Sequence, residues 1–166
     1  MSLECKKNPQ TGESLYFTVH KSGLKIYIMP RKGYSSGYAI FGTKYGSVDS
    51  EFVVPGENTP TKVPDGIAHY LEHKMFDMPD GSNVFDSFSR FGGNANAFTS
   101  FNMTAYLFSA ASNFEDNLRV LMDYVQKPYF TEESVKKEQG IIGQEIKMYD
   151  DSADWRVFFN FLGCLY

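Results

Sequence analysis

The order of strand-like and helix-like segments constrains the fold of this chain more than any other feature of its sequence. Apolar and polar residues alternate in the early part of the chain, and a Ser22-Gly23 turn separates two of these segments. Such alternation is typical of half-buried strands. Strands are therefore predicted over residues 15–20, 24–29 and 38–52, whereas the polar residues 1–14 are expected to be loose.

Helical segments follow a loop over residues 53–64 that is rich in proline and glycine. Residues that often cap helices precede three of them, namely Asp65, Ser112 with Glu115, and Thr131. Helices are predicted over residues 66–78, 84–91, 112–126 and from 132 to beyond 150, with strands over 96–100 and 104–110. The order strands, helices, strands, helices predicts an α+β fold with helices packed on one face of a sheet.

The bulk properties of the chain exclude several classes of partner. Its 166 residues suffice for one domain with a core, and its net charge of −4 gives no sign of nucleic-acid binding. No apolar run approaches the ~18 residues of a membrane span. The N-terminus lacks a usual secretory signal, and Cys5 and Cys164 form no motif. We therefore expect a cytoplasmic protein with neither a nucleic-acid nor a membrane partner.

The last residues of the chain are unusually apolar. Aromatic and aliphatic residues dominate positions 155–166, although natural termini tend to be polar and loosely held. This segment is expected to be buried against other structure. We therefore expect residues 1–166 to form a single domain that has been cut from a longer protein.

The segment His69-Tyr70-Leu71-Glu72-His73 carries the strongest chemical signal. Its two histidines lie four residues apart in the predicted helix 66–78. At about 100° per residue, positions i and i+4 differ by only about 40° around a helix, so both imidazoles can reach one cation. Glu72 lies next to that face. The order is H-x-x-E-H, the inverse of H-E-x-x-H.

A catalytic zinc site usually has three protein ligands and one open position, so a third ligand is expected from another element. Glu138 and Glu145 lie seven residues apart in the last predicted helix and share a face to within about 20°. Apolar neighbours indicate that this segment is partly buried, and a buried carboxylate needs a partner. His20, at the end of the first predicted strand, is a weaker candidate.

Each of these residues also has a simpler interpretation. Histidines four residues apart occur on solvated helix faces and in buried pairs, and the spacing alone does not separate these cases from a metal site. Glu138 and Glu145 alone would more often be solvated charges. The core is the default place for the aromatic residues Phe98, Tyr106 and Phe108. The position of Glu72 between the two histidines is what favours a metal.

Four segments, in this order, resemble the pitrilysin/insulinase family of zinc peptidases, which includes the mitochondrial processing peptidases. Residues 66–73, followed by Phe76, are similar to the signature helix of that family. Residues 92–100 resemble its substrate-binding strand, residues 104–108 the next strand, and residues 137–146 its second acidic helix. The resemblance implies an α+β domain with a mostly antiparallel sheet, residues 1–166 being its N-terminal part.

The resemblance also implies a role for each residue of the metal site. His69, His73 and Glu145 would bind one Zn²⁺ per chain. Glu72 would be the general base of a zinc-dependent endopeptidase. Glu138 would support one of the ligand histidines.

The implied substrate is a peptide or an unfolded polypeptide. Asn96, Ala97 and Phe98 would hold it as an added strand, and Phe76 would help to line a side-chain pocket. Family members carry a further homologous domain or subunit, so a second one is expected to complete the substrate chamber. The isolated chain is therefore expected to bind zinc without cleaving peptides.

Two alternative functions fit part of the same pattern. S-ribosylhomocysteine lyases also hold a metal on an H-x-x-E-H helix, but they need cysteines at the site, and Cys5 and Cys164 are poorly placed. A non-catalytic partner subunit of a peptidase would share the fold. Such subunits typically lose motif residues, and this sequence has retained them.

Overall fold

A computed structural model describes residues 3–166, which divide into two compact units, the described part of Met1–Ser35 and Ser36–Tyr166. The first unit is a three-stranded antiparallel sheet in the order β1-β2-β3. Its strands are β1 (Glu4–Lys7), β2 (Ser14–Val19) and β3 (Lys25–Ile28). The assignment of all 166 residues to one domain stays a prediction.

The hairpin predicted in the first unit is confirmed. Gly23 lies in its turn with a φ of 87°, and its N–H donates to the carbonyl oxygen of His20. The prediction that residues 1–14 are loose is wrong for Glu4–Lys7, because β1 pairs with β2, and residues 1–2 lie outside the described residues. Every residue of β1 is exposed, so this edge strand lacks the apolar alternation that would reveal it in the sequence.

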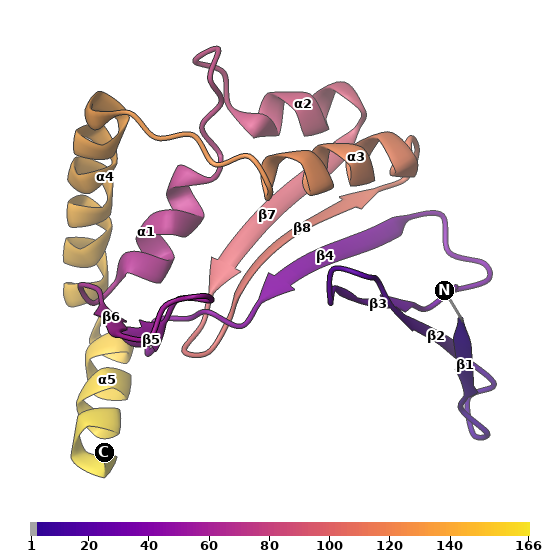
Figure 1. The fold of residues 1–166 in the computed structure, drawn as a ribbon, viewed down its shortest axis with the longest axis horizontal. Helices are drawn as coiled ribbons and strands as arrows, with labels where there is room; N and C mark the ends of the chain where they lie inside the picture. Colours follow the sequence, from indigo (N-terminus) through magenta and orange to yellow (C-terminus); the bar gives the residue numbers. More distant parts are fainter. Residues whose placement is uncertain (1–2) are drawn as a thin grey trace. The chain divides into compact units, whose positions relative to one another are not determined.

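The second unit is built around an antiparallel sheet in the order β4-β8-β7 (Figure 1). Figure 1 shows α2 and α3 side by side over one face of this sheet, with α1 near the end of β7. This arrangement confirms the predicted α+β fold. The elements are β4 (Gly37–Thr43), β7 (Gly93–Thr99), β8 (Thr104–Ala110), α1 (Ile67–Lys74), α2 (Val84–Arg90) and α3 (Phe114–Tyr124).

An aromatic core fills the space between the sheet and these helices. Its residues come from α2, α3, β8 and the segment after α1, and many of their rings contact one another edge to face or stacked. Tyr106 and Phe108, for which the core is the default place, do lie in it, whereas Phe98 is 41% exposed and does not. The buried cluster comprises Phe76, Val84, Phe88, Tyr106, Phe108, Ala110, Leu121 and Tyr124.

The single strand predicted over residues 38–52 is wrong, because the chain turns at Gly46. The N–H of Gly46 donates to Asp49 Oδ2 (2.7 Å), and a Cβ at this glycine would lie 2.5 Å from backbone atoms of residues 101–103. This close approach ends the extended run after β4. Two short antiparallel strands follow, β5 (Glu51–Val53) at the end of the predicted strand and β6 (Pro60–Lys62) within the predicted loop.

Two helices begin differently from the sequence prediction. Gly66, in the left-handed region at φ 82°, stands at the N-cap of α1, so Asp65 does not cap it. Asn113 stands at the N-cap of α3 with a φ of 50°, and no side-chain capping bond forms there. The predicted capping box of Ser112 and Glu115 is therefore absent, since the N-cap of α3 is Asn113 rather than Ser112.

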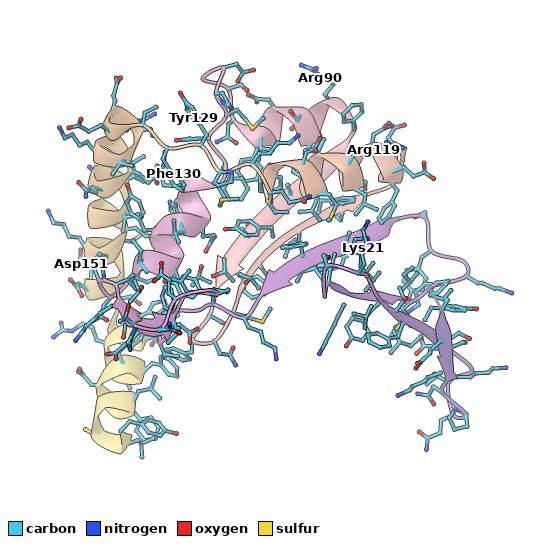
Figure 2. The ribbon with its side chains drawn as sticks, viewed as in Figure 1. Lys21, Arg90, Arg119, Tyr129, Phe130 and Asp151 are labelled. Atoms are coloured by element: carbon cyan, nitrogen blue, oxygen red, sulfur yellow. The ribbon has the colours of Figure 1, made fainter. Side chains whose placement is uncertain are left out.

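The C-terminal part consists of α4 (Glu132–Asp150) and α5 (Ala153–Leu165), which are separated near Asp151 (Figure 2). Thr131 caps α4 as predicted, and it forms a capping box with Ser134. The connection that carries Tyr129 and Phe130 leads from α3 to α4 (Figure 2), and α4 packs against α1.

The apolar end of the chain is not buried as predicted. Within the described residues, no residue of α5 is buried. The helix packs against α4, and its Trp155 and Phe159 remain 43% and 51% exposed. Packing against a single helix cannot cover an aromatic face of this size. None of the helices in residues 3–166 is both long and apolar enough to cross a membrane.

Candidate metal centre

Helix α1 presents the two histidines of the motif on one face. The ring centroids of His69 and His73 are 4.7 Å apart, and the ring planes are inclined at 82°. Both side chains are half-buried, with 32% and 24% of their surfaces exposed. The helical spacing predicted from the sequence is therefore realised, and the two imidazoles can approach one ion.

Two hydrogen bonds fix α1 against α4. The hydroxyl of Tyr70 donates to the carbonyl oxygen of Val135 (2.7 Å), and His73 Nδ1 donates to Glu138 Oε1 (2.8 Å). The second bond orients the imidazole, because a ring whose Nδ1–H is held by a carboxylate directs its Nε2 lone pair outward. The contact places Glu138 beside His73, and its role in supporting a ligand stays a prediction.

Glu145 lies where a third ligand is needed. Its Oε1 is 3.6 Å from His69 Nε2, and its Oε2 is 3.5 Å from His73 Nε2. Bond lengths of about 2.0–2.2 Å in a tetrahedral zinc site separate neighbouring ligand atoms by about 3.3–3.6 Å. The observed distances therefore fit a zinc site. The three residues form the one cluster of potential metal ligands found in residues 3–166.

Tyr149 stands one turn after Glu145 in α4. Burial first, and then the charge and hydrogen-bond acceptance of Glu145, raise the pKa of the Tyr149 hydroxyl. The Tyr149 ring also contacts Trp155 of α5 edge to face, at 5.2 Å between centroids. The raised pKa keeps this phenol uncharged at neutral pH.

Glu72 points to the sheet side of α1 and is almost buried, with 8% of its surface exposed. Thr99 at the end of β7 donates its hydroxyl to Glu72 Oε2 (2.6 Å). The pKa of the Tyr106 hydroxyl is raised, mainly by burial and to a smaller extent by the neighbouring charge of Glu72. The Glu72 carboxylate therefore has a hydroxyl partner and an uncharged phenol as neighbours.

The residues predicted to hold substrate lie on an edge strand. In the part of the chain that the structure describes, β7 pairs with β8 on one side and has no strand partner on the other. Asn96 and Phe98 are exposed, and Ala97 is half-buried. Phe76 is buried in the aromatic core, stacked on Phe85 with centroids 4.5 Å apart. The roles of these residues in substrate binding remain predictions.

The weaker ligand candidates are not part of the ligand cluster found within residues 3–166. His20 belongs to the first unit, where its Nδ1 lies 2.8 Å from the Ser22 hydroxyl. Cys5 and Cys164 are free and exposed, and neither takes part in a metal-ligand cluster within residues 3–166. This is unfavourable to a lyase-type site, which would need a cysteine ligand.

Two contacts of the centre were not predicted from the sequence. Tyr149 stands four residues after Glu145, so helical spacing alone could have suggested that the two side chains are neighbours. The contact between Thr99 and Glu72 joins a strand end to a helix, and no local pattern indicates it. Only the packing of α1 against β7 brings these two side chains together.

Replacing Glu138 with leucine is expected to weaken zinc affinity by about 10- to 100-fold, because the residue that orients His73 is lost. Leucine suits this nearly buried position, so the helix should remain packed. Competition with a chromogenic zinc chelator measures the change. Glu133→Leu makes the same substitution at an exposed site of α4 and should have no effect. Equal affinities in the two variants would contradict the role of Glu138.

Comparison with known proteins gives a consistent assignment. The profile of the family described as Insulinase (Peptidase family M16) matches residues 55–162. The uncharacterized zinc protease YmfH of Bacillus subtilis (strain 168) is 56% identical over 157 residues, which cover 95% of this chain and 36% of YmfH. The uncharacterized zinc protease YmxG of the same organism is 36% identical over 103 residues, covering 60% of this chain and 25% of YmxG.

Solved structures share the fold. An M16-like peptidase candidate from Alicyclobacillus acidocaldarius superposes with a TM-score of 0.82 and 38% identity, over 96% of this chain and 35% of that one. A protease from Helicobacter pylori gives a TM-score of 0.71 and 25% identity, over 87% of this chain and 34% of that one. The chain thus spans about a third of the length of these relatives.

Proposed function

The chain belongs to the insulinase (M16) family of peptidases, and on this basis we propose that it supplies the metal centre of a zinc-dependent endopeptidase. The observation that carries the proposal is the convergence of His69 and His73 from α1 with Glu145 from α4. One Zn²⁺ per chain fits this set of two imidazoles and one carboxylate. Relatives named as zinc proteases support the choice of metal.

The residues around the centre have distinct roles in the proposed reaction. A bound zinc ion would supply a Lewis acid that polarises the scissile carbonyl and makes water more acidic. Glu72 accepts the proton of the attacking water and passes it to the leaving amine. Glu138 holds the His73 ring in the orientation that directs Nε2 toward Glu145. The uncharged phenol of Tyr149 lies near the carboxylate of Glu145.

The proposed substrate is a peptide or an unfolded polypeptide that adds to the edge of β7. Main-chain hydrogen bonds to this strand would hold it, with Asn96, Ala97 and Phe98 at the contact. An extended substrate suits an edge strand, since its free N–H and C=O groups can pair with another chain. The chain covers 36% of YmfH, so a second homologous domain or subunit would complete the chamber. We place the reaction in the cytoplasm.

The proposal is tested on the complete protein as it is made in the cell. Purified protein should contain about one zinc equivalent and cleave an unfolded polypeptide such as reduced, carboxymethylated casein. A chelator should abolish cleavage and added zinc should restore it. Cleavage that resists chelation would overturn the metal role. Zinc binding without any cleavage would instead favour a non-catalytic partner subunit, and thioether cleavage would favour a lyase.

A further inference from the structure

The carboxylate of Glu72 needs a partner because it is almost buried. A charged group that leaves water without a hydrogen-bond partner is strongly disfavoured. Within residues 3–166, the side chain that donates to this carboxylate is Thr99, at 2.6 Å from Oε2. A hydrogen bond to an ionised acceptor is short and about twice as strong as a neutral one, and this distance is typical of that class.

The direction of this hydrogen bond follows from the neighbouring hydroxyl. Thr99 lies opposite Thr104 in the β7–β8 register, with 3.4 Å between their hydroxyl oxygens. Thr104 donates to the carbonyl oxygen of Tyr45 (2.8 Å), which uses its single proton. The proton of Thr99 is therefore left for Glu72, the nearer of its two polar neighbours.

Thr99 is held rigidly and so can hold Glu72. Its strand is paired with β8 up to this residue, and its β-branched side chain has restricted χ1 rotation. The hydrogen bond therefore connects the proposed base on α1 to the end of β7, the strand proposed to bind substrate. A carboxylate anchored through Oε2 keeps Oε1 in one direction relative to that strand.

We propose that Thr99 is a positioning residue, whose hydroxyl holds the Glu72 carboxylate in the orientation needed for proton transfer next to the substrate strand. This inference rests on the proposed peptidase function, since it assigns a support to the proposed base. Misplacing a catalytic group by about 1 Å can lower a rate about 100-fold. Loss of the hydroxyl should therefore affect turnover far more than binding.

The test uses Thr99→Val in the complete protein, because valine keeps the branched shape and removes the hydroxyl. We expect kcat for peptide hydrolysis to fall about 10- to 100-fold, with KM and zinc affinity within about twofold of the parent. Thr99→Ser should recover most of the rate, whereas Thr99→Ala should not. Thr43→Val removes a hydroxyl from an exposed residue that also pairs with Thr104, and it should leave the rate unchanged.

The outcomes separate this inference from the proposed function. An inactive parent protein would contradict the function, whereas an active parent with an equally active Thr99→Val variant would contradict only the inference. A parallel loss of zinc affinity, or a Thr99→Ser variant as slow as Thr99→Ala, would overturn it as well.

A double-mutant cycle gives a readout that needs no activity. Thr99→Val and Glu72→Gln, alone and together, are compared by their free energies of unfolding without zinc. We expect the double variant to lose less stability than the sum of the two single losses, because Glu72→Gln already replaces the charged hydrogen bond with a weaker neutral one and leaves less for Thr99→Val to remove. Additive losses would contradict the contact on which the inference depends.

Discussion

Replacing Glu72 with glutamine is expected to lower kcat for peptide hydrolysis by about 10²- to 10⁴-fold, the usual contribution of a general base. Glutamine has nearly the same size and keeps an oxygen that can accept the hydroxyl proton of Thr99. It cannot, however, take a proton from water at neutral pH. Zinc content should stay at the parent level, because Glu72 is not among the clustered ligands. Steady-state kinetics and metal analysis on the complete protein measure the two effects.

Glu133→Gln is the matched control for this variant, since it removes a carboxylate from an exposed position in the first turn of α4. Its rate should equal that of the parent. Turnover by Glu72→Gln near the parent rate would exclude Glu72 as the base, whatever the zinc content. A large loss of zinc in the same variant would indicate instead that Glu72 is a ligand.

Glu145→Gln should reduce zinc affinity by more than about 100-fold, beyond the range usual for residues that only support a ligand. The carboxylate of Glu145 approaches both histidines, at 3.6 and 3.5 Å from their Nε2 atoms. A neutral amide offers zinc neither the charge nor the donor strength of a carboxylate. Zinc competition titration measures the change, and circular dichroism tests whether the helices persist.

The neighbouring exposed residue supplies the control for the ligand variant. Gln144→Ala changes the same turn of α4 without touching the cluster and should bind zinc as the parent does. Unchanged zinc affinity in Glu145→Gln would place the third ligand elsewhere. That result would remove the geometric basis of the peptidase proposal, which is the convergence of His69 and His73 from α1 with Glu145 from α4.

Much of the metal centre was predictable because its strongest signal is local. The spacing of His69 and His73 places both rings on one helix face whatever the rest of the chain does. Glu145 was predicted as the third ligand by resemblance, and its carboxylate does lie beside both rings. Periodicity alone would have left it among the solvated charges of a long helix.

Two predictions failed because they depend on how distant segments of the chain pack against one another. The strand over 38–52 breaks because Gly46 meets the backbone of residues 101–103, and no residue near Gly46 indicates that contact. The apolar segment 155–166 was expected to be buried, yet within the described chain α5 packs on α4 and leaves its rings exposed. Apolar composition indicates that a segment can be buried, but a covering surface must come from elsewhere.

Local patterns were enough to predict which side chains share a helix face and where most helices and strands lie, because those properties depend on hydrogen bonds and rotations within a few residues. The contacts of Glu138 with His73, of Glu145 with both imidazoles and of Thr99 with Glu72 are seen only in the folded chain. Each of these contacts joins elements far apart in the chain. Their geometry depends on how α1 packs against α4 on one side and β7 on the other.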